Sequence, residues 1–281
     1  MIYLNSFELS DRKVNDPNIY PYNVFCGKEI RRFVFSEITV LYGNNGSGKS
    51  TILNLIANKL KLKGKEYSDI AIDFSENTYF GIVDYCGRFS AECSYELGQN
   101  EETGKLVRKL PDNSRFIKSE DILYEVKKIE QKNVLADGMV YDYVNKGMTK
   151  ESAKAFLATK EGSKQMDYIL FAQEKYSNGE TAMQIFEEYL RPDALYLLDE
   201  PEVSLSPANQ VMLAEEIVKM SRYLDCQFII ATHSPFMLGT LDSKIYNIDK
   251  PDCRVMQWYE LENIRYFYNF FQKHKAAFEE D

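Results

Sequence analysis

The sequence lacks the features that mark membrane, secreted and zinc-binding proteins. No apolar run approaches the ~18 residues that are needed to cross a membrane. The opening stretch, MIYLNSFELSDRK, has no basic segment followed by an apolar one, as a secretory signal would. The five cysteines form no C-x-x-C pair, which favours reduced thiols over a zinc site. We therefore expect a cytoplasmic protein with no direct membrane insertion.

The sequence also has fewer basic than acidic residues. The 281 residues include 34 Lys and Arg against 43 Asp and Glu, which gives a formal net charge of -9. This balance disfavours non-specific binding of nucleic acid by the whole surface, although it allows a local basic patch. The hydrophobic content of 44% is enough for a sizeable core. The length suits one large domain, or one domain that contains an inserted lobe.

Alternating strand and helix patterns run through the chain. The stretch FVFSEITVLYG, residues 33–43, predicts a strand, and KSTILNLIANKLKLKG, residues 49–64, has helical spacing and ends at a glycine. Later, LYLLDE and CQFIIATHS have the length and apolar character of central parallel strands, and a helical stretch separates them. Strand, helix and strand in this order predict an α/β fold.

A phosphate-binding loop stands between the first strand and helix. GNNGSGKST fits the pattern G-x-x-x-x-G-K-[ST] in the required context. Glycines let backbone N–H groups turn toward phosphate oxygens, and the helix start adds a positive dipole end. Lys49 supplies a cation for the β- and γ-phosphates, and the Ser50 hydroxyl suits Mg²⁺. The predicted nucleotide-binding residues are Asn44, Asn45, Gly46, Ser47, Gly48, Lys49, Ser50 and Thr51.

The strand LYLLDE ends in the acidic side chains that such a loop needs. Open α/β sheets bind their ligands at the carboxyl ends of their strands. We expect Asp199 to hold the metal, and Glu200 to orient or deprotonate the attacking water. Glu202, two positions further on, is interpreted as a structural charge. The predicted cofactors are therefore ATP and Mg²⁺.

Two further polar features accompany these carboxylates. His233, one of only two histidines, ends the strand QFIIATH and is expected to contact the γ-phosphate or order the water. The stretch YSNGETAMQIF carries Ser177, Asn178, Gly179 and Glu180 at the start of a predicted helix. Ser177 with Glu180 is a helix capping box, and the same serine and free amides could form a second anion site. Both interpretations can hold together.

These motifs, taken in order, resemble those of the ABC ATPase superfamily. Residues 43–50, 177–180, 199–200, 204–207 and 233 look like its Walker A, signature, Walker B, D-loop and H-loop. The signature S-N-G-E departs from the S-G-G-Q of transporter subunits, and DEPEVSLSP departs from their D-E-P-T-x-x-L-D. The chain is more similar to soluble ABC ATPases of the SMC, RecF and overcoming-lysogenization-defect kind. It is most similar to small stand-alone bacterial ATPases of the AAA family.

The resemblance implies a fold and further site residues. It implies an ABC-type P-loop domain over residues 1–281, with a mixed, mainly parallel core sheet and an antiparallel β subdomain. A helical lobe would be inserted at residues 91–176. No Gln stands where the family has its Mg²⁺-sensing residue, and Glu120 in FIKSED is the acidic equivalent, or else only a helix N-terminal charge. The aromatic that stacks on adenine would be Tyr20 or Tyr22, unless both belong to the core.

The resemblance also implies a mechanism. Each P-loop of such proteins is completed by the signature of a second subunit, so we expect a head-to-tail homodimer around two ATP-Mg. Hydrolysis would drive a partner protein, such as a nuclease, or a process on nucleic acid, such as bacterial defence or DNA repair. The alternatives are the ATPase subunit of a membrane transporter and a non-catalytic nucleotide-binding regulator.

Two surface features stay open between a structural and a binding role. The stretch KLKLKGK, residues 59–65, places lysines at the end of the predicted P-loop helix, where they complement the helix dipole or contact DNA. The aromatic run YFYNFF, residues 266–271, is predicted to be a helix packed on the body, with a partner-docking surface as the alternative.

Overall fold

The computed structural model divides the chain into two compact units. It describes residues 1–11, 19–64, 71–73, 81–83, 85–99, 104, 106–122, 139–141, 143–144, 146–161, 179–203 and 205–279. The first unit consists of Met1–Ser119, Arg191–Val203 and Pro207–Asp281, and the second of Glu120–Leu190 and Ser204–Ser206.

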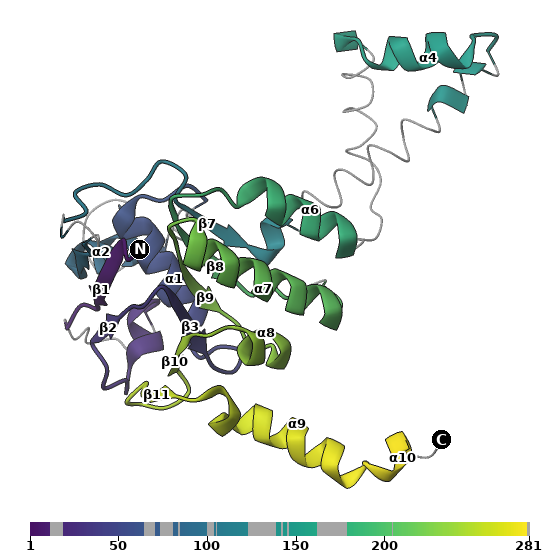
Figure 1. The fold of residues 1–281 in the computed structure, drawn as a ribbon. Helices are drawn as coiled ribbons and strands as arrows, with labels where there is room; N and C mark the ends of the chain where they lie inside the picture. Colours follow the sequence, from purple (N-terminus) through teal and green to yellow (C-terminus); the bar gives the residue numbers. More distant parts are fainter. Residues whose placement is uncertain are drawn as a thin grey trace. The chain divides into compact units, whose positions relative to one another are not determined.

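A six-stranded, mainly parallel sheet forms the centre of the first unit (Figure 1). Strand β3 lies between β9 and β10 and is parallel to both, and β8 and β7 continue the parallel run on the far side of β9. Only β11 is antiparallel, at the edge beside β10. Every residue of β3 and β9 is buried, as expected for central strands covered on both faces. The bounds are β3 (Ile38–Tyr42), β7 (Arg115–Lys118), β8 (Ala194–Asp199), β9 (Cys226–Ala231), β10 (Lys244–Asn247) and β11 (Val255–Met256).

Helices cover both faces of this sheet. Helix α1 (Lys49–Leu60) packs on β8 and β9, and its apolar residues join one core with Leu195, Leu197 and Ile229 of those strands. The intervening residues of β8 and β9 point to the other face because side chains alternate along a strand. Helix α7 (Pro207–Tyr223) packs on β9 and on α8 (Pro235–Thr240), and Figure 1 shows α1 and α7 on opposite sides of the sheet.

A second sheet, of three antiparallel strands, is joined to the first by a buried amide. Strand β1 (Leu4–Glu8) lies between β2 (Arg32–Val34) and β6 (Ser94–Leu97). The Gln227 side chain, fully buried on β9, accepts hydrogen bonds from the backbone N–H groups of Tyr3 and Leu4, at 2.9 and 2.8 Å. Its Nε2 donates to the carbonyl oxygens of Leu4 and Ser36, at 2.9 and 3.0 Å. All four bonding groups of this amide are therefore satisfied.

Shorter elements complete the first unit. Helix α2 (Tyr85–Glu92) packs on α1, and β4 (Ala71–Asp73) pairs with β5 (Gly81–Val83) in an antiparallel ribbon. The remaining elements are the 3-10 helices η1 (Tyr22–Phe25) and η2 (Trp258–Glu260) and the helices α9 (Glu262–Lys273) and α10 (Ala276–Glu279). Burial raises the pKa of the Cys93, Cys226 and Cys253 thiols to about 11, which suits unreactive core thiols.

The second unit contains helices α4 (Lys150–Leu157) and α6 (Gly179–Tyr189). Thr149 begins α4, where its hydroxyl accepts a hydrogen bond from the Ser152 backbone N–H at 3.2 Å. Ala153 and Leu157 of α4 pack with Met139 and Val140 in a small core of their own. This unit therefore has a hydrophobic centre separate from the main one.

The α/β fold with a mainly parallel sheet and an antiparallel sheet confirms the fold predicted from the sequence. Two details differ. The single strand expected at residues 33–43 is two strands, β2 and β3, which belong to different sheets. The lobe at 91–176 stays a prediction: its residues up to 119, which include β6 and β7, belong to the first unit, and its residues from 120 on belong to the second.

The second difference is the aromatic run at 266–271. It is helical, as predicted, but it does not pack on the body. Tyr266 is 71% exposed and Tyr268 53%, and Ile264 is the only buried residue of α9. At about 100° per residue, the aromatic side chains at 266, 267, 268, 270 and 271 spread over slightly more than half of the helix circumference, which is wider than a narrow core-facing stripe.

Candidate functional site

The motif residues of the first unit lie at one edge of the parallel sheet. The loop 43–48 follows β3, Asp199 and Glu200 stand at the end of β8, and His233 follows β9. Strand β9 pairs in parallel with both β3 and β8, so the carboxyl ends of all three strands meet at this edge. This is the place where open α/β sheets bind ligands.

Backbone shape in the loop 43–48 explains its glycines. Gly46 and Gly48 have φ values of +80° and +105°, a region that residues with a Cβ rarely adopt. A Cβ at Gly43 would lie 2.6 Å from Ser47 Oγ, and one at Gly48 would lie 2.6 Å from Val24 Cγ1. Nothing lies within 4 Å of a Cβ built at Gly46, so the loop is tight at its ends and open at that glycine. Among the residues that the structure describes, the buried Ser47 hydroxyl has no hydrogen-bond partner.

Lys49 is held inside this loop by its own backbone. The side chain is only 4% exposed, and Nζ donates to the carbonyl oxygens of Gly43 and Asn44 at 2.8 and 3.2 Å. A third partner is Glu200, whose Oε1 lies 3.7 Å from Nζ. A buried ammonium needs such partners. The cation is thus already positioned where phosphate oxygens would approach the loop.

Ser50 and Asp199 meet directly. Ser50 Oγ donates to Asp199 Oδ1 at 3.0 Å. The pair offers hard oxygen ligands, a hydroxyl and a carboxylate, which is the donor set that suits Mg²⁺ together with phosphate and water. Within the described residues no group of three or more His, Cys, Asp or Glu side chains is placed to hold a metal.

Glu200 takes an unusual backbone conformation. Its φ is +47°, in the left-handed region that is uncommon for residues other than glycine. Two hydrogen bonds hold it there: its N–H donates to Ala231 O at 2.8 Å, and its carbonyl accepts from the Val203 N–H at 3.1 Å. The turn brings the Glu200 carboxylate to Lys49 and to His233, whose Nδ1 lies 3.7 Å from Oε1. Strain of this kind concentrates at functional sites.

Glu202 is the buried carboxylate behind His233. It is 7% exposed, and its Oε1 accepts from the Thr232 hydroxyl at 2.6 Å and from the His233 backbone N–H at 3.0 Å. The same oxygen lies 3.7 Å from His233 Nδ1, while Oε2 has no hydrogen-bond partner in the described part of the chain. Glu202 therefore fixes the backbone that carries His233, whereas the imidazole is 46% exposed.

Two residues of this site were not predicted from the sequence. The Asp249 carboxylate accepts from the backbone N–H of Asn44 at 2.9 and 3.1 Å, and from Asn44 Nδ2 at 3.0 Å. Asn263 Nδ2, in the first turn of α9, donates to Asn44 Oδ1 at 3.2 Å. In the sequence, Asp249 is visible as the acidic end of the stretch KIYNID. Because strand β10 pairs with β3, this residue comes to lie beside the loop that follows β3. The sequence alone does not give the order of the strands in the sheet, so it does not reveal that Asp249 lies beside Asn44.

The two candidate aromatics have different surroundings. The Tyr20 hydroxyl donates to Thr51 Oγ1 at 3.3 Å, and the residue is 41% exposed. The Tyr22 ring instead packs edge-on against Phe89, with ring centroids 4.7 Å apart, and adjoins the main core. Tyr20 is thus the aromatic that stands at the loop.

The remaining predicted site residues belong to the second unit or lie outside the described residues. Ser177 and Asn178 lie outside the described residues, and Gly179 and Glu180 begin α6 in the second unit. Glu120 is an exposed residue of that same unit. The roles of all five therefore stay predictions. In the described part of the chain, no helix has the length and apolar character to cross a membrane.

Comparison with known proteins gives a family and several distant relatives. Residues 98–239 match the family described as "AAA domain, putative AbiEii toxin, Type IV TA system". A "Putative ABC transporter ATP-binding protein" of Sulfurisphaera tokodaii is 24% identical over 211 residues, 75% of this chain but only 37% of that protein. The tungstate uptake ATP-binding protein TupC of Peptoclostridium acidaminophilum is 28% identical over 205 residues, 72% of this chain and 77% of its own.

Solved structures of two kinds overlap with the chain. An SMC head domain from Pyrococcus furiosus, bound to the C-terminal domain of ScpA, has 14% identity and a TM-score of 0.44, and the match covers 98% of this chain and 100% of that one. A dimeric bacterial ABC transporter cassette has 14% identity and a TM-score of 0.43, with 92% and 99% covered. Overlaps this loose carry no conclusion about function.

The family match covers just over half of the chain and includes β8, β9 and the residues Asp199, Glu200 and His233. The match at 98–239 leaves out the loop 43–50, which the structure places against those residues. The chain therefore belongs to the family described as "AAA domain, putative AbiEii toxin, Type IV TA system".

Proposed function

We propose that this chain binds ATP with Mg²⁺ and hydrolyses it. The observation that carries the proposal is the meeting of Lys49, Glu200 and His233 beside the Ser50–Asp199 pair at one sheet edge. A cation for phosphate, a pair of oxygen ligands for a metal and a carboxylate for water are the parts that phosphoryl transfer requires. A plain glycine turn would explain none of the contacts to β8 and β9.

Each side chain has a defined task in this proposal. Lys49 exchanges its carbonyl partners for β- and γ-phosphate oxygens, and the amides of the loop 43–48 and of the start of α1 donate to the phosphates. Ser50 and Asp199 would hold Mg²⁺, which neutralises charge on the phosphates when bound. Glu200 accepts a proton from the attacking water, whose oxygen bonds to the γ-phosphorus while the bond to the ADP oxygen breaks. His233 orders that water or contacts the γ-phosphate.

Tyr20 is proposed to stack on the adenine ring. It is the aromatic that contacts Thr51, next to the phosphate loop, and its ring is partly exposed. Tyr22 is occupied by its contact with Phe89, so we assign it to the core.

The active form is proposed to be a homodimer. The chain carries one set of motifs, so the stretch 177–180 of one copy would complete the Lys49 site of the other in a C₂ arrangement. Glu120 would supplement the metal site. The dimeric cassette among the similar structures is in keeping with this arrangement and does not establish it. ATP would then act as a switchable link between the two copies.

The process that this switch drives is proposed to involve a partner protein, such as a nuclease, or nucleic acid, in bacterial defence or DNA repair. The toxin–antitoxin wording of the family description supports defence. The second candidate is a transporter ATPase subunit, because both curated relatives carry transport-related names. Stable co-purification with a membrane permease would favour the transporter role, and a soluble partner would favour the first.

Phosphate release by the purified chain tests the central claim. We expect Mg²⁺-dependent ATP hydrolysis that falls at least a hundredfold in Glu200→Gln, because the amide cannot take the proton of water. ATP binding by this variant should persist, whereas Lys49→Ala should lose it. Hydrolysis by Glu200→Gln at the native rate would disprove its role as base, and tight ATP binding by Lys49→Ala would refute the loop assignment.

A further inference from the structure

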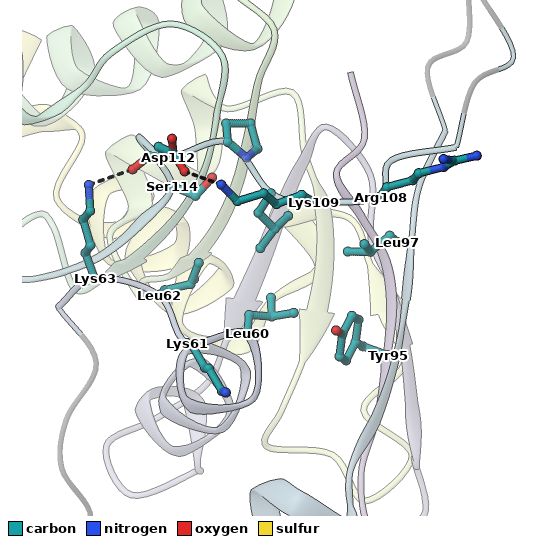
Figure 2. A pocket seen from close by; sticks show the side chains of 12 residues that line it. Leu60, Lys61, Leu62, Lys63, Tyr95, Leu97, Arg108, Lys109, Asp112 and Ser114 are labelled. Atoms are coloured by element: carbon teal, nitrogen blue, oxygen red, sulfur yellow. Dashed lines mark hydrogen bonds and ion pairs between the residues drawn. The ribbon is translucent and has the colours of Figure 1, made fainter.

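The two surface features that the sequence leaves open differ in the structure. In the lysine stretch, Lys59 Nζ donates to Ala91 O at 2.8 Å, and Lys61 is the C-cap of α1. Lys63 Nζ donates to the Asp112 carbonyl oxygen at 2.8 Å, beside the pocket that Figure 2 shows. These contacts favour the structural role for the lysines. The aromatic side chains of α9, by contrast, are exposed.

Helix α9 is attached to the rest of the first unit in its first turn. Ile264 is its only buried residue, and Asn263 Nδ2 donates to Asn44 Oδ1 at 3.2 Å. Every residue from Arg265 to Lys273 is exposed. At about 100° per residue, the charged side chains share one side of the helix and the aromatic ones occupy the other. The helix is therefore amphipathic, and its apolar face is exposed.

The exposed aromatic surface is large enough for a protein contact. Monomeric proteins rarely expose apolar patches of more than a few hundred Å², and a standard interface buries about 800 Å² on each side. At about 200 Å² for each side chain, the aromatic residues of α9 and α10 present about 700 Å². Pairing over part of this face suits a reversible contact. The residues, which expose between 43 and 71% of their area, are Tyr266, Phe267, Tyr268, Phe270, Phe271 and Phe278.

The charges at the two ends of α9 are complementary to those of a second copy. Glu262 and Lys273 are eleven positions apart, so they lie within about 20° of each other on one edge of the aromatic face. Two copies in antiparallel orientation therefore bring Glu262 of each copy to Lys273 of the other, with Phe267 and Tyr268 beside the two-fold axis. Neither charge has an ion pair among the residues that the structure describes. Both also complement the dipole of their own helix, and an antiparallel pair keeps that arrangement.

We propose that α9 pairs with α9 of a second copy of this chain, as antiparallel helices about a two-fold axis. The aromatic faces meet, and two ion pairs between Glu262 and Lys273 close the ends. The contact forms without nucleotide, so it is separate from the ATP-dependent dimer proposed above. Because Asn263 bonds to Asn44, each paired helix begins at the phosphate loop of its own copy.

Sedimentation equilibrium of a Lys49→Ala parent, without nucleotide, measures this association. We expect a monomer–dimer equilibrium with a Kd of about 10 to 100 µM, as for a small reversible interface. Glu262→Lys and Lys273→Glu should each weaken it about tenfold, because two like-charge contacts replace two ion pairs. An equimolar mixture of the two variants should dimerise as the parent does, since every contact then joins a Lys to a Glu. Neither misfolding nor the helix dipole, which both variants oppose, can produce this recovery.

Matched variants control for charge and for loss of an exposed ring. Glu215→Lys, at an exposed position of α7, changes the net charge as Glu262→Lys does and should leave the Kd unchanged. Phe267→Ser should weaken pairing at least tenfold, because aromatic contacts near the axis are lost. Tyr223→Ser removes a ring that is 78% exposed at the end of α7, and it should pair as the parent does.

Three results overturn the proposal: a parent that stays monomeric up to about 200 µM, a mixture that pairs as weakly as its components, or a Phe267→Ser variant that pairs like the parent. A monomeric parent that sediments with vesicles of phosphatidylcholine and phosphatidylglycerol, and loses this in Phe267→Ser, would show that α9 binds a lipid surface instead. The ATP-dependent dimer is measured at about 1 µM, where the α9 pair is dissociated. The two proposals therefore fail separately.

Discussion

At the scale of single residues, the three carboxylates of the stretch 199–202 have three different environments. Asp199 accepts from Ser50, and Glu200 lies between Lys49 and His233 with 28% of its side chain exposed. Glu202 is buried and accepts from Thr232 and from the His233 backbone. The left-handed turn at Glu200 separates them, because it sends consecutive side chains in different directions. Three side chains that carry the same carboxylate group are therefore not expected to have the same function in the site.

Removal of Glu202 is expected to cost stability. Glu202→Ala leaves the Thr232 hydroxyl and the His233 N–H unpaired in a buried place, so the free energy of unfolding should fall by about 2 to 4 kcal/mol. Glu202→Gln keeps an oxygen acceptor and should lose clearly less. Urea unfolding of the two variants beside the parent measures the difference. Equal losses in both would show that charge, not hydrogen bonding, is what Glu202 contributes.

At the scale of elements, local patterns predicted the strands and helices well but not their partners. Residues 33–43 read as one strand because apolar and β-branched residues dominate both halves. The chain in fact changes sheets at residues 35–37, where Ser36 N–H and hydroxyl bond to Thr39 Oγ1 and Ile38 O. Asp249 was missed for a related reason. Its partner Asn44 lies 205 positions away, and only the β3–β10 pairing brings them together.

The link from the end of β10 to the phosphate loop is expected to order that loop. Asp249→Ala removes three hydrogen bonds to Asn44, two of them to the backbone N–H. We expect the free energy of unfolding without nucleotide to fall by about 1 to 3 kcal/mol, as for hydrogen bonds to a charged group. Asp242→Ala, which breaks only an exposed ion pair with Arg222, is the control and should change little. Similar losses in both variants would contradict an ordering role.

At the scale of the whole molecule, the site in the first unit is proposed to be completed by a second copy of the chain. In a Glu200→Gln background, ATP should produce a dimer in sedimentation velocity, because hydrolysis no longer opens it. Ser177→Arg adds a bulky cation at the proposed signature and should abolish this dimer while ATP binding persists. Ala155→Arg, on the exposed side of α4, adds the same charge and should leave the dimer intact.

The two outcomes together separate the dimer from a general effect of charge. A sedimentation profile that ATP does not change would argue against the dimer altogether. Loss of the dimer in both arginine variants would place the contact elsewhere in the second unit.

The position of β3 in the sheet also governs when the ATP site can form during synthesis. Both neighbours of β3 are encoded far downstream, β9 at Cys226–Ala231 and β10 at Lys244–Asn247. Domains fold from the amino terminus as they emerge, but strand pairings over such separations are slow because a long loop must close first. A nascent chain that ends before residue 226 holds the whole phosphate loop and neither strand beside it. Nucleotide binding should therefore appear late in translation, and in one step, once the chain has emerged as far as β10.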